Sequence, residues 1–151
     1  MQKDLLEFCQ KIKNMWFKVK LDTNGTNPEL LQELLSKNLL DYVAMDLKTT
    51  IIDYEKVVWT NIDTNKILES VNIIKNSNIN YEFRTTLIKN IHTLEHIKEI
   101  SGTILKWVKS YNFQNFKKTK ILNPNFIWES FSLLELNFFK EVVLKSVENC
   151  E

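Results

Sequence analysis

The stretch FKVKLDTNGTNP, residues 17–28, carries the pattern that decides the fold. Residues 17–21 alternate apolar and basic side chains, which predicts a strand. The next four residues, Asp-Thr-Asn-Gly25, predict a turn because Asn-Gly tolerates a positive φ angle. Asn27 and Pro28 are typical of a helix cap and a first helical residue. The stretch therefore predicts a strand, a turn and a helix in direct succession.

Helices and strands continue to alternate along the rest of the chain. Apolar spacing of three to four residues indicates helices, and alternation or short apolar runs indicate strands. The predicted helices are residues 4–14, one that begins at Pro28, a turn over 53–58, one capped by Asp63, 93–100, 103–109 (where a strand competes) and 133–147; the predicted strands are 17–21, 41–45, 80–86 and 111–116.

This order predicts an α/β protein whose parallel strands are joined by right-handed helical crossovers. Four strands are too few for a closed eight-stranded barrel, so we expect a partial (βα) barrel or open sheet. Its first strand then needs a neighbour or remains an edge. No linker interrupts the 151 residues, which we treat as a single domain, residues 1–151.

Composition excludes several classes of protein. The 20 Lys and Arg residues nearly balance 19 Asp and Glu, unlike the basic surface of a nucleic-acid binder. The two glycines, Gly25 and Gly102, lie too far apart for a phosphate-binding loop. The two cysteines form no CxxC pair, and no apolar run has the length of a membrane span. With no signal-peptide pattern, we expect a cytoplasmic protein.

Polar residues follow the predicted strands 17–21 and 41–45 and the segment 81–83 of the third, where sites of parallel α/β proteins form. They are Asp22 and Asn24, then Asp46 and Lys48, then Arg84. We call these polar residues at the strand ends the rim. The rim suits a small zwitterionic ligand, because Arg84 could bind a carboxylate through two hydrogen bonds and Asp or Asn could accept hydroxyl protons. Each motif alone also fits a plain turn or an Asp46–Lys48 ion pair.

Other chemistry-bearing residues have simpler interpretations. His92 and His96 have a metal-binding spacing but no evident third ligand, so we interpret them as solvated helix residues. We expect the four tryptophans in the core or an interface, and the lysine run at 117–120 in a solvated loop. We expect Cys150 to be an exposed, inert thiol.

The same rim motifs carry a family resemblance. Residues 17–28, the DYVAMDLK block at 41–48 and the YEFRTT block at 81–86 with His92-Thr93 resemble the radical S-adenosylmethionine activases. The likeness is greatest to the activating protein of anaerobic ribonucleoside-triphosphate reductase, with pyruvate formate-lyase activating enzyme as a relative. Residues 111–116 and 118–124 resemble the closing stretch of that family, so the likeness covers nearly the whole chain in order.

The resemblance implies a partial βα barrel that holds a 4Fe–4S cluster and S-adenosylmethionine. Reductive cleavage there makes a 5′-deoxyadenosyl radical, which takes hydrogen from a glycine of a glycyl-radical enzyme such as anaerobic ribonucleotide reductase. By the same resemblance, Asp22 and Asn24 would lie beside the cofactor or a nearby cation. Asp46 and Lys48 would lie on the same rim, and Arg84 would face the methionine carboxylate.

The sequence departs from that family in its cluster ligands. The CxxxCxxC motif and the GGEP segment, which precede the DTNG strand in the family, are absent. Cys9, at an apolar helix position, and Cys150 do not supply the three clustered thiolates that a cluster needs. We therefore expect the carboxyl-terminal part of an activase, inactive alone and dependent on an amino-terminal half that carries the cluster. A noncatalytic module that binds a partner protein or nucleotide, and a gene remnant, remain the alternatives.

Overall fold

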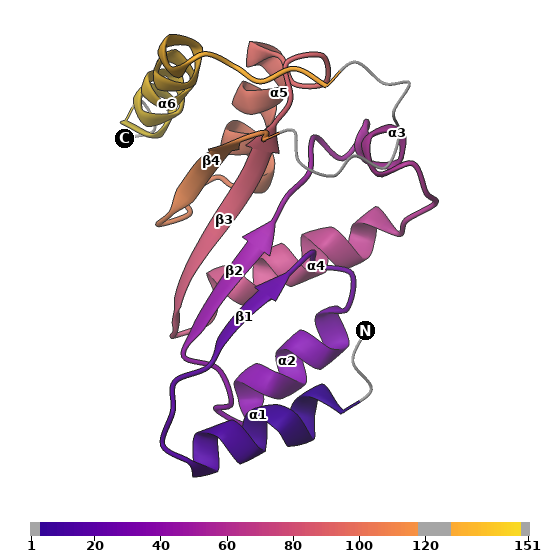
Figure 1. The fold of residues 1–151 in the computed structure, drawn as a ribbon, viewed down its shortest axis with the longest axis vertical. Helices are drawn as coiled ribbons and strands as arrows, with labels where there is room; N and C mark the ends of the chain where they lie inside the picture. The colour runs from indigo at the N-terminus through magenta and orange to yellow at the C-terminus, as the bar shows by residue number, and fades with distance from the viewer. Residues whose placement is uncertain (1–3, 118–127, 149–151) are drawn as a thin grey trace. The chain divides into compact units, whose positions relative to one another are not determined.

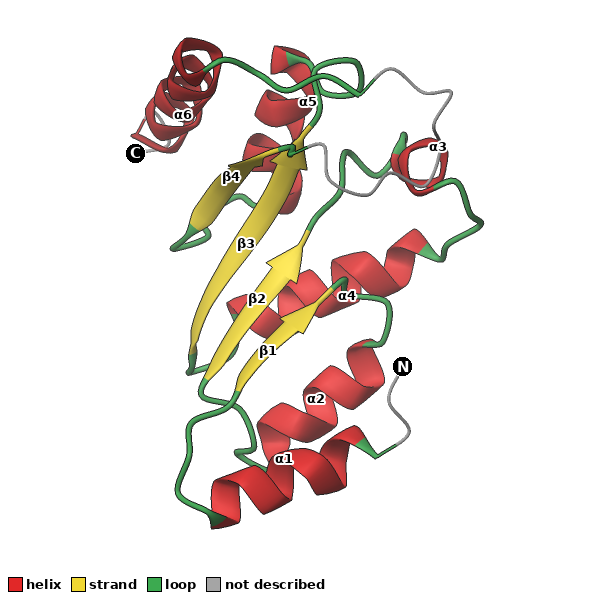
Figure 2. Ribbon diagram, viewed as in Figure 1, coloured by secondary structure: helices red, strands yellow, loops and turns green. Residues whose placement is uncertain are grey.

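The computed structural model describes residues 4–117 and 128–148 and contains a four-stranded sheet (Figures 1 and 2). The strands are β1 (Lys20–Thr23), β2 (Tyr42–Asp46), β3 (Asn80–Leu87) and β4 (Tyr111–Asn115), in the order β1-β2-β3-β4. β1 and β2 are parallel, with Lys20 opposite Tyr42 and Thr23 opposite Met45. The parallel sheet with alternating helices confirms the predicted α/β fold of partial-barrel type.

The helices are α1 (Leu5–Asn14), α2 (Pro28–Ser36), α3 (Tyr54–Val58), α4 (Thr64–Lys75), α5 (Leu94–Glu99) and α6 (Leu133–Glu148), with a short π-helical turn, η1 (Ile100–Ile104), directly after α5. The chain divides into two compact units. The first comprises Met1–Asp46 and Asp63–Phe83, and the second Leu47–Ile62 and Arg84–Glu151. A single domain over residues 1–151 stays a prediction.

The first unit is built from α2 and α4, which pack side by side, together with β1 and β2. The Asn27 side chain caps α2 by accepting a hydrogen bond from the Leu30 N–H at 2.9 Å. Asp63 caps α4 in the same way through the Asn65 N–H at 3.0 Å. Both caps confirm the predicted helix starts. The buried residues of this core include Leu31, Leu34, Val43, Met45, Ile67, Val71 and Ile74.

The second unit packs α6 against α5 and β4. Its core contains the buried side chains of Leu87, Ile97, Phe131, Leu136 and Phe139. The Thr93 hydroxyl caps α5 by accepting from the His96 N–H, and His96 Nδ1 in turn accepts from the Thr93 backbone N–H at 3.0 Å. This reciprocal cap fixes where α5 begins relative to the end of β3.

The first strand begins later than its alternation predicts, at Lys20. Val19 N–H donates to the Asp41 carboxylate at 2.7 Å, and Phe17 N–H donates to the Ile12 carbonyl at 3.3 Å. Phe17 therefore closes the end of α1. The Val19 carbonyl accepts from the Asp41 and Tyr42 N–H groups at 2.9 and 3.3 Å, but its N–H is taken by the Asp41 side chain, so the strand itself begins at Lys20. The strand continues through Asp22 to Thr23, so Asp22 lies within β1.

The predicted helix over residues 103–109 is wrong. The π-helical turn ends at Ile104, and Trp107 adopts a left-handed φ of 67°. Leu105 is buried, and β4 begins only six residues later, at Tyr111. The backbone must therefore reverse here, where a helix would have carried it onward.

Three of the four tryptophans do not lie in the core. Trp16, Trp59 and Trp107 are 96%, 47% and 61% exposed, so for these three only the alternative of an interface stays a prediction. Cys9 is buried, as expected of an apolar helix position, and burial raises the pKa of its thiol. Cys150 and residues 118–124 lie outside the described residues.

Within the part of the chain that the structure describes, no helix is long and apolar enough to cross a membrane.

Candidate functional site

In the first unit, Asp22, Asn24 and Asp46 lie at the carboxyl ends of two adjacent parallel strands. Thr23 pairs with Met45, so Asn24 follows β1 at the level where Asp46 ends β2. The structure thus brings together three of the residues that the sequence singled out. Two carboxylates and an amide at one strand edge can bind hydroxyl and ammonium groups.

These side chains belong to the polar face of the sheet. The Lys20 ammonium lies 5.0 Å from the centre of the Tyr42 ring and 3.2 Å from Glu82 Oε1. Because side chains alternate along a strand, Asp22 lies on the same face as Lys20, and Asp46 on the same face as Tyr42. The opposite face carries Val43, Met45 and Phe83, which are fully buried in the core.

The turn that holds Asn24 requires a glycine at position 25. Gly25 has φ 76°, and a Cβ there would overlap the Cε of the buried Met45 side chain. Its N–H donates to Thr23 Oγ1 at 3.1 Å, and its carbonyl accepts from the buried Ser70 hydroxyl at 2.9 Å. The turn is therefore fixed on both sides by side chains of the first unit.

Asn24 uses its side-chain oxygen within this turn. Oδ1 accepts from the Thr26 N–H at 3.2 Å and from the Thr26 hydroxyl at 2.8 Å. We expected Asn24 to take a hydroxyl proton, but these contacts occupy its acceptor. The amide nitrogen is the atom through which Asn24 would meet a ligand.

In the second unit, Leu47 is held by partners on β3. Its N–H donates to the Arg84 carbonyl at 2.8 Å, and its carbonyl accepts from the buried Thr85 hydroxyl at 2.8 Å. Thr85 Oγ1 also lies 2.8 Å from the Tyr111 hydroxyl, which donates to it because the Thr85 proton is already used. Burial raises the pKa of Tyr111 far above its ordinary range, so the phenol keeps the proton that it donates.

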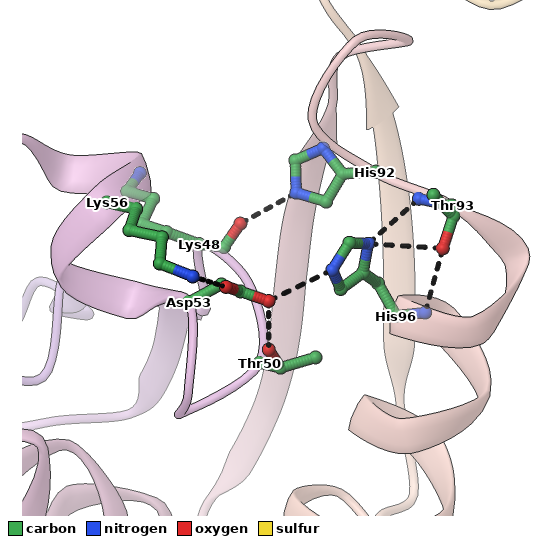
Figure 3. A network of polar contacts seen from close by, with 7 residues as sticks. All are labelled: Lys48, Thr50, Asp53, Lys56, His92, Thr93 and His96. Carbon is green, nitrogen blue, oxygen red and sulfur yellow. Dashed lines mark hydrogen bonds and ion pairs between the residues drawn. The ribbon is translucent and has the colours of Figure 1, made fainter.

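Lys48 is held in the same manner by two buried side chains. Its N–H donates to the Tyr54 hydroxyl at 3.3 Å, and its carbonyl lies 2.8 Å from His92 Nε2 (Figure 3). His92 is only 2% exposed and precedes α5, so its interpretation as a solvated helix residue is wrong.

The partners of His92 define its tautomer. The Ile88 N–H donates to Nδ1 at 3.0 Å, so Nε2 carries the proton that it donates to the Lys48 carbonyl. Burial lowers the pKa of His92, which favours this neutral form.

A second contact joins the segment after β2 to the segment after β3, between Asp53 and His96. His96 Nε2 lies 3.2 Å from Asp53 Oδ2, and the Lys56 ammonium lies 2.7 Å from Asp53 Oδ1 (Figure 3). Hydrogen bonds from Lys56 and then from His96 lower the pKa of the Asp53 carboxyl. Asp53 therefore stays ionised and anchors the start of α3.

Arg84 lies inside a strand, although we expected it directly after one. β3 continues to Leu87 because the alternation of buried and half-buried residues persists to that point. Arg84 shares its side of β3 with Glu82 and Thr86, two residues away in each direction. A guanidinium on this side can bind a carboxylate through two parallel hydrogen bonds.

The residue after Lys48 has an unusual hydroxyl. Thr49 is fully buried, and its Oγ1 is the one buried side-chain polar atom in the described part of the chain without a hydrogen-bond partner. Sequence reasoning missed Thr49, Thr85 and His92 as contributors. The only signal for the last two is that they fall in the YEFRTT and His-Thr motifs.

A groove of about 740 Å³ lies between α2 and α4, on the helices of the first unit. Asparagine side chains, among them Asn65, Asn72 and Asn76, line much of it. None of the five candidate residues lines this groove, so it is a feature separate from the strand ends.

Comparisons with known proteins find a similar sequence and a similar fold. No protein-family profile matches the sequence. Over 131 residues, the chain is 35% identical to a "putative glycyl-radical enzyme activating enzyme" of Methanocaldococcus jannaschii. The match covers 83% of the chain but 54% of this relative, so the chain spans about half the length of the activating enzyme that it resembles.

A solved structure has the same fold as this chain. A crystallised domain of pyruvate-formate lyase-activating enzyme from Bacteroides vulgatus superposes with a TM-score of 0.69. The superposition covers 96% of this chain and 84% of that domain, at 13% sequence identity. The expected likeness to activating enzymes is thus confirmed at the level of relationship and fold.

The residues present do not fit an iron–sulfur cluster. The sequence has two cysteines, and in residues 4–117 and 128–148 no group of three or more His, Cys, Asp or Glu side chains could hold a metal ion. Cys9 is buried in α1. Groups that complement S-adenosylmethionine are present within each unit taken by itself. Carboxylates of the first unit suit its amino and hydroxyl groups, and an ammonium and a guanidinium of the second suit its carboxylate.

Proposed function

We propose that this chain supplies the S-adenosylmethionine-binding part of a glycyl-radical enzyme activating enzyme. The observation that carries the proposal is the 35% identity to a protein of that description, which extends over 83% of the chain. The polar residues at the ends of β1 and β2 and on β3 support it, because their charges complement the ligand.

In this proposal, the chain's own residues bind and orient the ligand. Lys48 and Arg84 bind the methionine carboxylate, and Asp22 and Asp46 accept protons from hydroxyl or amino groups. Asn24 donates from its amide nitrogen, since its oxygen serves the turn. The cluster ligands come from sequence outside these 151 residues, either in the same polypeptide or in a separate amino-terminal half.

We further propose a glycyl-radical enzyme, specifically an anaerobic ribonucleotide reductase, as the protein on which the assembled activase acts, in the cytoplasm. The support is the resemblance of the DTNG, DLK and FRTT motifs to the activating protein of that reductase. The 54% coverage of the archaeal relative is consistent with a second, cluster-carrying part.

Ligand binding to the full 151-residue chain tests the proposal. Titration with S-adenosylmethionine, followed by calorimetry and amide chemical shifts, should give saturable binding. Lys48→Gln should weaken binding at least about tenfold, because a charge-assisted hydrogen bond is lost. Lys37→Gln removes an equally long cation from an exposed ion pair on α2 and should leave affinity unchanged.

Absence of saturable binding, or equal effects of the two lysine variants, would contradict the proposed role. A noncatalytic binding module would then be the better description. Addition of a separately expressed part that carries CxxxCxxC should restore glycyl-radical formation in the reductase, read by its electron paramagnetic resonance signal. Radical formation that does not depend on this chain would exclude it from the activase.

A further inference from the structure

The two-residue segment that follows β2 has an unusually complete set of backbone hydrogen bonds. All four N–H and C=O groups of Leu47 and Lys48 have partners within the second unit. Three of those partners are buried side chains, and the fourth is the β3 backbone. The partners are the Arg84 carbonyl, the Thr85 hydroxyl, the Tyr54 hydroxyl and His92 Nε2.

Burial of so many polar side chains around one dipeptide is not needed for packing. An apolar residue at position 92 would fill the same space without the desolvation of an imidazole. A buried polar group with all its partners instead specifies one local conformation. The cluster therefore restricts the backbone of Lys48 more than the fold alone requires.

Of the four hydrogen bonds to Leu47 and Lys48, the one from His92 spans the longest separation in sequence. The His92 ring bonds to Ile88 N–H through Nδ1 and to the Lys48 carbonyl through Nε2, 44 positions earlier in the sequence. Both nitrogens are used, so the ring cannot rotate without loss of a hydrogen bond. The imidazole thereby fixes the distance between the turn after β3 and the backbone of Lys48 (Figure 3).

We propose that His92 is a positioning residue that sets the backbone of Lys48, and through it the place from which the Lys48 ammonium meets a ligand carboxylate. This inference rests on the proposed binding of S-adenosylmethionine. His92 acts through Lys48 and does not touch the ligand. The Asp53–His96 contact ties the same two segments without bonding to Lys48, and so provides an internal control.

Two amide variants each keep one of the two hydrogen bonds that the His92 ring makes. In His92→Gln, the side-chain amide nitrogen reaches the former position of Nε2 and can still donate to the Lys48 carbonyl. In His92→Asn, the side-chain oxygen can accept from Ile88 N–H, but the shorter side chain does not reach Lys48. His96→Asn breaks the contact with Asp53 and leaves the Lys48 carbonyl bonded.

The first measurement is the carbonyl ¹³C shift of Lys48 with the amide shift of Thr49, in the full chain without ligand. We expect both to move in His92→Asn and to stay near wild type in His92→Gln and His96→Asn. This readout does not depend on the proposed function. Unchanged shifts in His92→Asn would overturn the inference even if S-adenosylmethionine binds.

The second measurement is affinity for S-adenosylmethionine. His92→Asn should weaken binding about tenfold, while His92→Gln should restore it to within about threefold of wild type. Equal weakening by both variants would assign His92 a general structural role and overturn the inference. If the wild-type chain binds no S-adenosylmethionine, the proposed function fails, and the Lys48 shifts still decide whether His92 sets that backbone.

Discussion

Replacement of Thr49 by valine should stabilise the protein. Thr49 is fully buried, and its hydroxyl has no hydrogen-bond partner. An unpaired buried hydroxyl costs about 1–3 kcal/mol, and a methyl group of nearly the same shape removes that cost. Part of the gain is offset because the methyl is slightly larger than the hydroxyl. We expect the free energy of unfolding to rise by about 1 kcal/mol.

Thr85 offers a matched control for this change. It is equally buried, but its hydroxyl donates to the Leu47 carbonyl and accepts from the Tyr111 hydroxyl, each at 2.8 Å. Thr85→Val leaves both partners unpaired in the interior. The same chemical substitution should therefore lower the free energy of unfolding by about 2 kcal/mol.

Urea denaturation of the three proteins measures the difference. The midpoint should rise for Thr49→Val and fall for Thr85→Val, with an unchanged slope. In thermal unfolding, each kcal/mol corresponds to about 2–4 °C for a chain of this size. If Thr49→Val destabilises the protein as strongly as Thr85→Val, the Thr49 hydroxyl must have a partner, and the premise is wrong.

Two further predictions concern the DTNG turn and the start of α6. Gly25→Ala should lower the free energy of unfolding by about 2–4 kcal/mol, because it combines a left-handed φ with overlap of the new Cβ and the Met45 side chain; a loss below about 1 kcal/mol in urea would contradict this. Glu135 should titrate in ¹³C NMR at a pKa of about 2, chiefly because Ser132 N–H donates to its carboxylate. Its contribution to stability should be complete above about pH 4.5 and disappear as the pH falls through about 2, whereas an ordinary titration midpoint would exclude the Ser132 contact.

The sequence predicts the elements whose signals are local. The Asn27 cap and the alternation along β3 depend on neighbouring residues, and both were found as expected. The start of β1 was missed because the Asp41 carboxylate, 22 residues away, binds the Val19 N–H that an earlier start would have used in the sheet. No periodicity over a short window can show such a contact.

In the candidate site, too, features with local signals could be predicted and features that depend on distant contacts could not. Strand ends predict that Asn24 and Asp46 lie at one edge of the sheet, since neighbouring parallel strands share an edge. The role of His92 depends on a carbonyl 44 positions away, and a helical spacing to His96 suggested a solvated residue instead. For Asn24, the sequence did not show that the side-chain oxygen accepts hydrogen bonds from Thr26 within its own turn, which makes that oxygen less available to a ligand.

The order of strands in the sheet has a consequence for synthesis of the protein. Sheet order follows chain order, β1-β2-β3-β4, so each strand emerging from the ribosome finds its sheet neighbour already made. β1 and β2 can pair as soon as Asp46 has been translated, and α2 lies between them in sequence. None of the four strands that the structure describes must wait for a partner from the far end of the chain. Folding can therefore advance in step with translation, because each new strand adds to the edge formed by the strand before it.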